Sequence, residues 1–125
     1  MTIRKAEPAD WPAVLTLIRS FPDQLVQNHL PEPHEFFVAE RDGAIVGCCA
    51  LEIYSQRLAE IRSLAVAPKH QGKGIASALV DACVASAKEK QVYEVLSITG
   101  AVDFFEKRGF GTFHNEKYAL IKVLG

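Results

Sequence analysis

Residues 35–54 constrain the fold most, because they contain two strand-like runs joined by an Asp-Gly pair. The runs "EFFVAE" and "AIVGCCALEIY" are rich in aromatic, β-branched and small apolar residues, and "RDG" stands between them. Asp-Gly at such a junction is a strong hairpin signal, since both residues tolerate the positive φ of a tight turn. The segment "LAEIRSLAV" follows as a third strand and is closed by Pro68. These segments predict a β-hairpin followed by a third strand.

Two helix-like segments accompany the strands. Asp10 offers an N-cap for the first, and Pro12 is tolerated in its first turn. Its apolar positions recur at helical spacing: Val14, Leu15, Leu17, Ile18 and Phe21. The second helix begins after Gly74, and its apolar positions follow the same period: Ile75, Leu79, Val80, Cys83 and Val84. Its last residues, "KEK", place lysines where the helix dipole favours them.

Shorter elements complete the order. "TIRKA" predicts an opening strand, "YEVLSI" a later one, "AVDFFEKRGF" a short helix stopped by Gly109, and "YALIKVL" a final strand. Residues 22–35 contain three prolines and predict a loop or a short, poorly specified helix, a kind of segment that often shapes a substrate mouth. The alternation of strands and helices predicts the α/β class with a mixed sheet.

Length and composition exclude several classes of protein. A chain of 125 residues is expected to form one domain, residues 1–125. Its net charge of −1 provides no basic field for nucleic acid, and its apolar runs are too short to span a bilayer. The first residues carry charges and no apolar core, so no signal peptide is expected. Three cysteines within apolar segments predict core thiols of a reducing compartment, hence a cytoplasmic protein.

The segment "HQGKGIASALV", residues 70–80, places two glycines directly before a helix. It matches neither the Walker phosphate loop nor the dinucleotide fingerprint, which need other glycine spacings. Consecutive amides from Gly72 to Ala76 at a helix N-terminus nevertheless suit a pyrophosphate. The alternative is a solvated strand-to-helix turn, and spacing alone leaves both interpretations open.

The motif Gln71-x-x-Gly74-x-Ala76 resembles the signature of the GNAT superfamily of N-acetyltransferases. "LAEIRSLAVAPKHQGKGIASALV", "FFEKRGF" and "FFVAERDGAIVGCCAL" resemble further segments of that superfamily in the same order, which leaves only residues 22–35 and the last dozen without support. The resemblance implies a mostly antiparallel mixed sheet of about six to seven strands with flanking helices, splayed between the fourth and fifth strands. Within the superfamily, the chain looks most like amino-acid N-acetyltransferases of the N-acetylglutamate synthase type, although its tail lacks their proline-lysine element.

The resemblance implies acetyl-CoA as co-substrate and no metal. It places the pyrophosphate on the amides of the Gly-rich loop and the pantetheine arm along the backbone of the third run, "LAEIRSLAV". The implied cofactor-binding residues are Leu64, Ala65, Val66, Gln71, Gly72, Lys73, Gly74, Ile75, Ala76 and Phe105. The backbone N–H of Leu64 is expected to polarise the thioester carbonyl.

Glu60 is the candidate general base, because the resemblance matches it to the catalytic glutamate in the "A-E-I" of histone acetyltransferases. Strict alternation along the strand places Glu60, Arg62, Leu64 and Val66 on one face. The alternative is that Glu60 only forms an ion pair with Arg62.

The acceptor is expected to be a small amine, preferably an α-amino acid, that attacks acetyl-CoA directly in a ternary complex. Arg62, and after it Arg19, are candidates to bind its carboxylate; the alternative for both is an ordinary ion pair. Phe104 and Phe105 stand where the superfamily often has a tyrosine that acts as general acid and protonates the leaving CoA thiolate. Five groups could replace this general acid, and the sequence does not choose among them: Tyr54, Tyr93, Tyr118, Ser97 and water.

Other functions also remain open. The chain could bind acyl-CoA without catalysis, or acylate a protein lysine or N-terminus. Superfamily members often dimerise, so a homodimer is a further expectation. The four histidines lack metal-ligand spacing and are expected on loop surfaces: His29, His34, His70 and His114.

Overall fold

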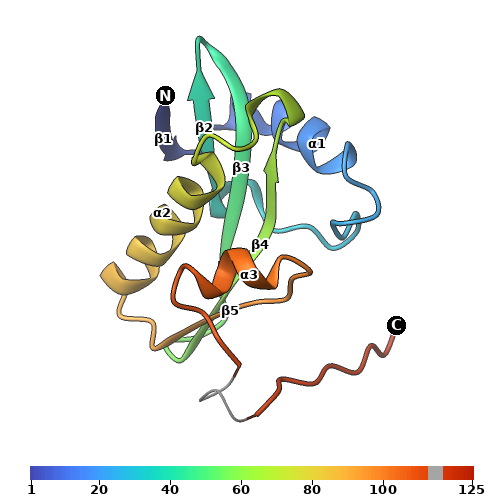
Figure 1. Ribbon diagram of the computed structural model, residues 1–125, viewed down its shortest axis with the longest axis vertical. Coiled ribbons are helices and arrows are strands. Elements are labelled where there is room, and N and C mark those ends of the chain that lie inside the picture. The colour runs from blue at the N-terminus through green and yellow to red at the C-terminus, as the bar shows by residue number, and fades with distance from the viewer. Residues whose placement is uncertain (113–116) are drawn as a thin grey trace.

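The computed structural model describes residues 1–112 and 117–125. A single sheet runs in the order β1-β2-β3-β4-β5 (Figure 1). Its strands are β1 Thr2–Lys5, β2 Phe36–Arg41, β3 Ala44–Ile53, β4 Leu58–Val66 and β5 Glu94–Ser97. The first four are antiparallel, and β5 pairs with β4 in parallel. The mixed, mostly antiparallel α/β sheet is confirmed, but its described part has five strands rather than six or seven.

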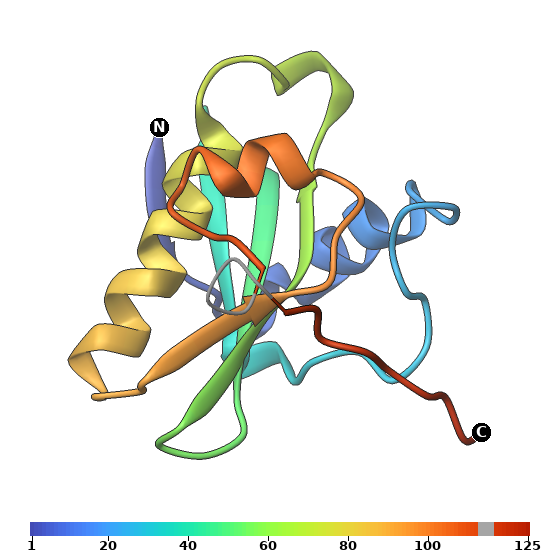
Figure 2. The same cartoon turned by 60° about the horizontal axis from the view of Figure 1, so that its bottom comes forward.

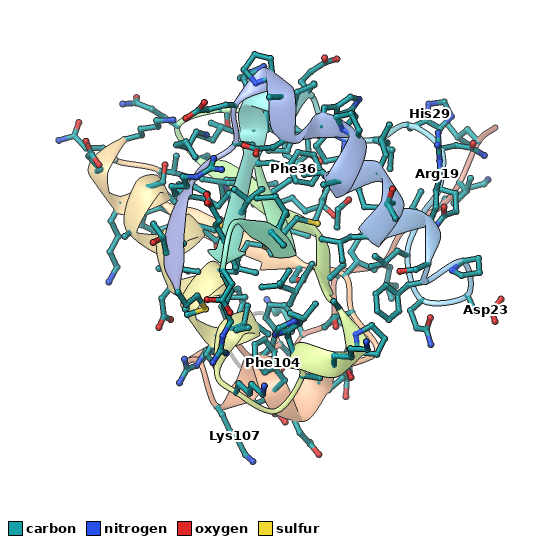
Figure 3. All side chains as sticks on the ribbon, turned by 90° about the horizontal axis from the view of Figure 1, so that it is seen from above. Arg19, Asp23, His29, Phe36, Phe104 and Lys107 are labelled. Atoms are coloured by element: carbon teal, nitrogen blue, oxygen red, sulfur yellow. The ribbon has the colours of Figure 1, made fainter. Side chains whose placement is uncertain are left out.

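The helices cover both faces of the sheet. They are α1 Trp11–Arg19, α2 Ile75–Glu89 and α3 Val102–Glu106, with single 3₁₀ turns at Pro8–Asp10, Pro33–Glu35 and Pro68–His70. Figure 3 shows α1 on one side of the strands and α3, with Phe104, on the other. The cluster under α1 includes Val14 and Ile18, and the cluster under α2 and α3 includes Leu79 and Phe105.

The β2–β3 hairpin forms as predicted. Asp42 and Gly43 have φ of 52° and 79°, the left-handed conformation that a tight hairpin turn requires. The pair joins strands that are buried through most of their length, so the turn sets the register for the centre of the sheet.

The predicted final strand at residues 118–124 is wrong. That segment has no regular secondary structure and pairs with no strand of the described chain, and only Lys117 forms a bridge. Its apolar side chains remain exposed, including Leu120 at 91% and Leu124 at 88%. An alternating apolar pattern forms a strand only where a neighbour supplies hydrogen bonds and a face to cover. The expectation for His114 lies outside the described residues.

Candidate active site

The sheet opens between β4 and β5. Their parallel pairing runs from Leu58↔Glu94 to Ile61↔Ser97 and stops there, while β4 continues to Val66. In Figure 2 the chain leaves β5 towards α3 and does not follow β4. The last five residues of β4 therefore have no partner strand on this side among the described residues, which agrees with the expected splay.

A β-bulge in β4 lies at this opening. Cys48 pairs with Ala65 and Ala50 with Arg62, so Ser63 and Leu64 together face a single residue of β3. Ser63 has a φ of 57°, and the extra residue reverses the alternation of the strand.

The prediction that Glu60, Arg62, Leu64 and Val66 share one face is therefore wrong. Ala59 and Ile61 belong to the cluster under α2, which leaves Glu60 and Arg62 on the α1 side of the sheet. Beyond the bulge, Leu64 and Val66 pack in the cluster under α2. The Glu60 side chain thus lies on the opposite face of β4 from the side chains of Leu64 and Val66, and it precedes the opening, in the part of β4 that pairs with β5.

The Gly-rich loop forms an open cradle at the start of α2. Gly72 and Gly74 have φ of 77° and 82°, and a Cβ added at either would meet nothing within 4 Å. Gly74 is the N-cap of the 15-residue helix α2, and no side chain caps its first amides. Unsatisfied N–H groups at the positive end of a helix dipole form a site for a phosphate-like anion.

A pocket of about 200 Å³ connects this cradle to the bulged end of β4. It is lined by Leu64, Ala65, Val66, Gln71 and Ala76, together with Phe21, Gln24 and Leu25. The first five are predicted cofactor residues from separate parts of the chain. The other three lie in the segment after α1: Phe21 was predicted on the apolar stripe of the first helix, whereas Gln24 and Leu25 fall in the predicted loop of residues 22–35.

Gln71 and the predicted cofactor residues outside the pocket lining differ in how far their side chains are buried. The side chain of Gln71 donates from Nε2 to the carbonyl of Val66 at 3.0 Å, which ties the loop to the end of β4. Lys73 is exposed, and the Ile75 side chain is buried under the helix. Phe105 is only 5% exposed and packs edge-on against Phe104 and Phe110, with ring centroids 5.1 Å apart. Phe105 is thus a core residue of α3.

The two opposed acidic side chains of β3 and β4, Glu52 and Glu60, have separate partners. Arg62 Nη1 lies 3.2 Å from both carboxylate oxygens of Glu52, and its Nη2 donates to the carbonyl of His29 at 2.8 Å. Glu60 instead accepts a hydrogen bond at Oε1 from the hydroxyl of Tyr54 at 2.5 Å. The alternative pairing of Glu60 with Arg62 is not found among the described ion pairs. The sequence carried no signal for the Glu52–Arg62 pair, and it offered Tyr54 only as one candidate acid rather than as a partner of Glu60, because both contacts depend on the β3–β4 register.

Arg19 and the cysteines lie apart from this cluster. Arg19 is exposed at the end of α1, beside the loop that carries His29 (Figure 3), and forms no ion pair with the described residues. All three cysteines are buried and free, as predicted for core thiols. Within the described ranges, no helix is long and apolar enough to cross a membrane, and no group of three potential ligands could hold a metal ion.

Solved structures with this fold include complexes with coenzyme A. A Mycobacterium tuberculosis protein crystallised in complex with CoA and NLQ aligns with a TM-score of 0.82 at 33% identity, over 90% of this chain and 75% of that one. N-acetylglutamate synthase from Neisseria gonorrhoeae, complexed with coenzyme A and N-acetyl-glutamate, aligns with a TM-score of 0.77 at 26% identity. That alignment covers 86% of this chain but 27% of the synthase.

Sequence relatives agree with the structures. An N-acetyltransferase of Chlorobaculum tepidum whose function is uncharacterised is 34% identical over 93% of this chain and 79% of its own length. The amino-acid acetyltransferase of Mycobacterium tuberculosis is 34% identical over 86% of this chain and 67% of its own length. The Pasteurella multocida enzyme of the same name is 32% identical, but the chain spans only 27% of it.

The fold, the splayed sheet and the helix-start cradle define an acyltransferase-type domain. The Acetyltransferase (GNAT) family model matches residues 2–110, and the chain belongs to that family.

Proposed function

We propose that this chain transfers an acetyl group from acetyl-CoA to the amine of a small molecule, with an α-amino acid as the preferred acceptor. The observation that carries the proposal is the meeting of the anion cradle and the pocket at the bulged end of β4, with Glu60 on the same strand three residues before the bulge residue Ser63. Its membership of the acetyltransferase family and the CoA-bound neighbours support it. The free, buried thiols support a reducing compartment, which we take to be the cytoplasm.

The residues present fit acetyl-CoA. The amides from Gly72 to Ala76 would hold the pyrophosphate, because the two glycines leave the backbone open to close approach. The pantetheine arm would follow the pocket along Leu64 and Val66, where β4 has no strand neighbour on its open side. Lys73 is exposed beside the cradle and would offset phosphate charge.

In the proposed reaction, the nitrogen of the acceptor amine attacks the thioester carbonyl. A C–N bond forms, the C–S bond breaks, and CoA leaves as thiolate. Glu60 takes the proton from the amine, directly or through water. The N–H of Leu64 stabilises the negative charge on the carbonyl oxygen.

An α-amino acid suits the charges beside Glu60. Glu60 and Arg62 lie two positions apart on one face of β4, about 6.6 Å along the strand, so a zwitterion can meet both. Arg62 already binds Glu52 and the His29 carbonyl, yet a guanidinium has five N–H donors, and no hydrogen bond from its Nε is found among the described residues. The amino-acid acetyltransferase relatives support this class of acceptor.

The test is CoA thiol release from acetyl-CoA with panels of amino acids, polyamines and peptides. We expect release that depends on an amino acid, and a loss of about 10²–10⁴-fold in kcat in Glu60→Gln. Glu89→Gln, which removes an exposed carboxylate at the end of α2, is the matched control and should resemble wild type. Acetyl-CoA binding without acceptor-dependent release would contradict the proposal.

The cradle has its own test. Gly74→Ala should weaken CoA binding measured by calorimetry at least tenfold, because Ala disfavours the positive φ that aims the amides. Gly43→Ala carries the same strain at a hairpin turn, with φ of 79° and open space around the new Cβ. Equal CoA affinities for these two variants would show that the Gly74 backbone is not the pyrophosphate site.

A further inference from the structure

Tyr54 joins the candidate site from the end of β3. Its hydroxyl donates to Oε1 of Glu60 at 2.5 Å, although 53% of the residue is exposed. An exposed tyrosine has water as an alternative partner, so its contact with this one carboxylate oxygen requires a local cause.

The β3–β4 register provides that cause. Glu52 and Glu60 are directly opposed across the two strands, so their side chains leave the same face of the sheet. Tyr54 follows Glu52 by two positions and extends on that face too. Its backbone N–H donates to the carbonyl of Leu58 at 3.0 Å, which fixes the tyrosine at the mouth of the turn.

The negative charges of Glu52 and Glu60 explain why the Glu60 carboxylate needs a hydrogen-bond donor. Two carboxylates directly opposed on a sheet repel each other. Arg62 binds Glu52 at 3.2 Å, and both side chains of this pair are about one-fifth exposed. Glu60 receives no cation among the described ion pairs, and the Tyr54 hydroxyl is the donor that the structure supplies.

Tyr54 remains a donor over the pH range in which an acetyltransferase works. Burial raises the pKa of its phenol well above the usual 10, and the hydrogen bond and negative charge of Glu60 and the charge of Glu52 add to the shift. The phenol therefore keeps its proton.

We propose that Tyr54 is a positioning residue: it holds one oxygen of the Glu60 carboxylate so that the other faces the acceptor amine. This inference rests on the proposed function. The amine proton passes to the second oxygen of Glu60, and Tyr54 keeps its own proton throughout.

A double-mutant cycle tests the assignment on the full chain. Tyr54→Phe should lower kcat about tenfold and leave the KM for acetyl-CoA unchanged, because the phenol acts through Glu60. In the Glu60→Gln background, Tyr54→Phe should cause no further loss. Thr16→Val, which removes an exposed hydroxyl hydrogen bond of α1, is the control for loss of a hydroxyl and should behave as wild type.

The outcomes separate this inference from the proposed function. Normal turnover in Tyr54→Phe, or losses that multiply in the double variant, would overturn the positioning role while the acetyltransferase activity stands. Absence of acceptor-dependent release by wild type would overturn the proposed function and, with it, the positioning role.

A spectroscopic titration checks the Tyr54–Glu60 contact without turnover. The phenolate absorbance of wild type should include one tyrosine that ionises late, and this component should be missing in Tyr54→Phe. In Glu60→Gln it should ionise earlier, because the negative partner is gone. Identical curves for wild type and Glu60→Gln would show that Tyr54 does not bond Glu60 in solution, which also overturns the inference.

Discussion

At the residue scale, the three thiols show how burial decides chemistry. Cys48 is fully buried, and burial raises the pKa of its thiol to about 12. The pKa of Cys49 is also raised, by its contact with Cys83 and then by burial, and the two sulfurs lie 3.7 Å apart. A thiol is nucleophilic only as thiolate, so these side chains serve as packing groups.

Thiol reagents should therefore discriminate sharply between the folded and unfolded protein. At pH 8 a thiol of pKa about 12 has roughly a thousandfold less thiolate than an ordinary one, and burial limits access further. We expect no fast reaction with a chromogenic disulfide in buffer and reaction of all three cysteines in denaturant. One cysteine reacting in buffer at the rate of a free thiol would contradict this prediction.

At the scale of elements, Gly47 determines how closely α2 approaches β3. A Cβ at this position would lie 3.1 Å from Leu79 Cδ1, 3.2 Å from Ile75 Cγ2 and 3.3 Å from the carbonyl of Ala65. Ile75 and Leu79 are in the first turns of α2, directly after the cradle. The small residue on β3 therefore places the start of α2 beside β4, where the cradle and the pocket meet.

Gly47→Ala should lower the free energy of unfolding by about 1–3 kcal/mol, because the added methyl overpacks this contact. It should also weaken CoA binding by moving the start of α2. Urea unfolding and calorimetry measure the two effects, with Gly100→Ala, whose new Cβ meets nothing within 4 Å, as the control. The cost in a Gly47→Ala/Leu79→Ala double variant should be less than the sum of the single costs. Wild-type stability in Gly47→Ala would refute the close packing.

At the scale of the whole molecule, Arg4 ties the N-terminal segment to the sheet. Its guanidinium lies 2.7 Å from an oxygen of Asp10 and 2.9 Å from one of Glu40. Asp10 also accepts the N–H of Glu7 at 2.8 Å. It occupies the N-cap position of α1 as predicted, but its side chain does not cap that helix. These bonds connect β1, the turn before α1 and β2.

This network predicts a pH-dependent stability. The hydrogen bond from Arg4, then that from the Glu7 N–H, holds the pKa of Asp10 below its usual range. A carboxyl with a depressed folded-state pKa stabilises above its unfolded pKa of about 3.9, and that contribution is lost as the pH falls through the folded value.

Asp10→Asn should therefore cost on the order of 1 kcal/mol at neutral pH, and the difference from wild type should shrink below about pH 4. Urea unfolding of both proteins at neutral and acidic pH measures this. A cost that is constant across the range would exclude the carboxylate as its source.

The sequence by itself determined the elements whose signals are local. The Asp42-Gly43 turn, the period of α2 and the Gly-rich stretch directly before that helix depend on contiguous residues, and each forms as predicted. The order of elements, and with it the open sheet that places a Gly-rich cradle after β4, followed from the same local patterns and the family resemblance.

Only the tertiary structure decided how side chains meet across the elements. The bulge at Ser63 reverses the alternation of β4, and the β3–β4 register gives Arg62 to Glu52 and Tyr54 to Glu60. Burial made Phe105 a core residue, and residues 118–124 found no strand to pair with in the described chain. Register, bulges and burial are set by partners distant in sequence, so a local pattern carries no information about which partner is found.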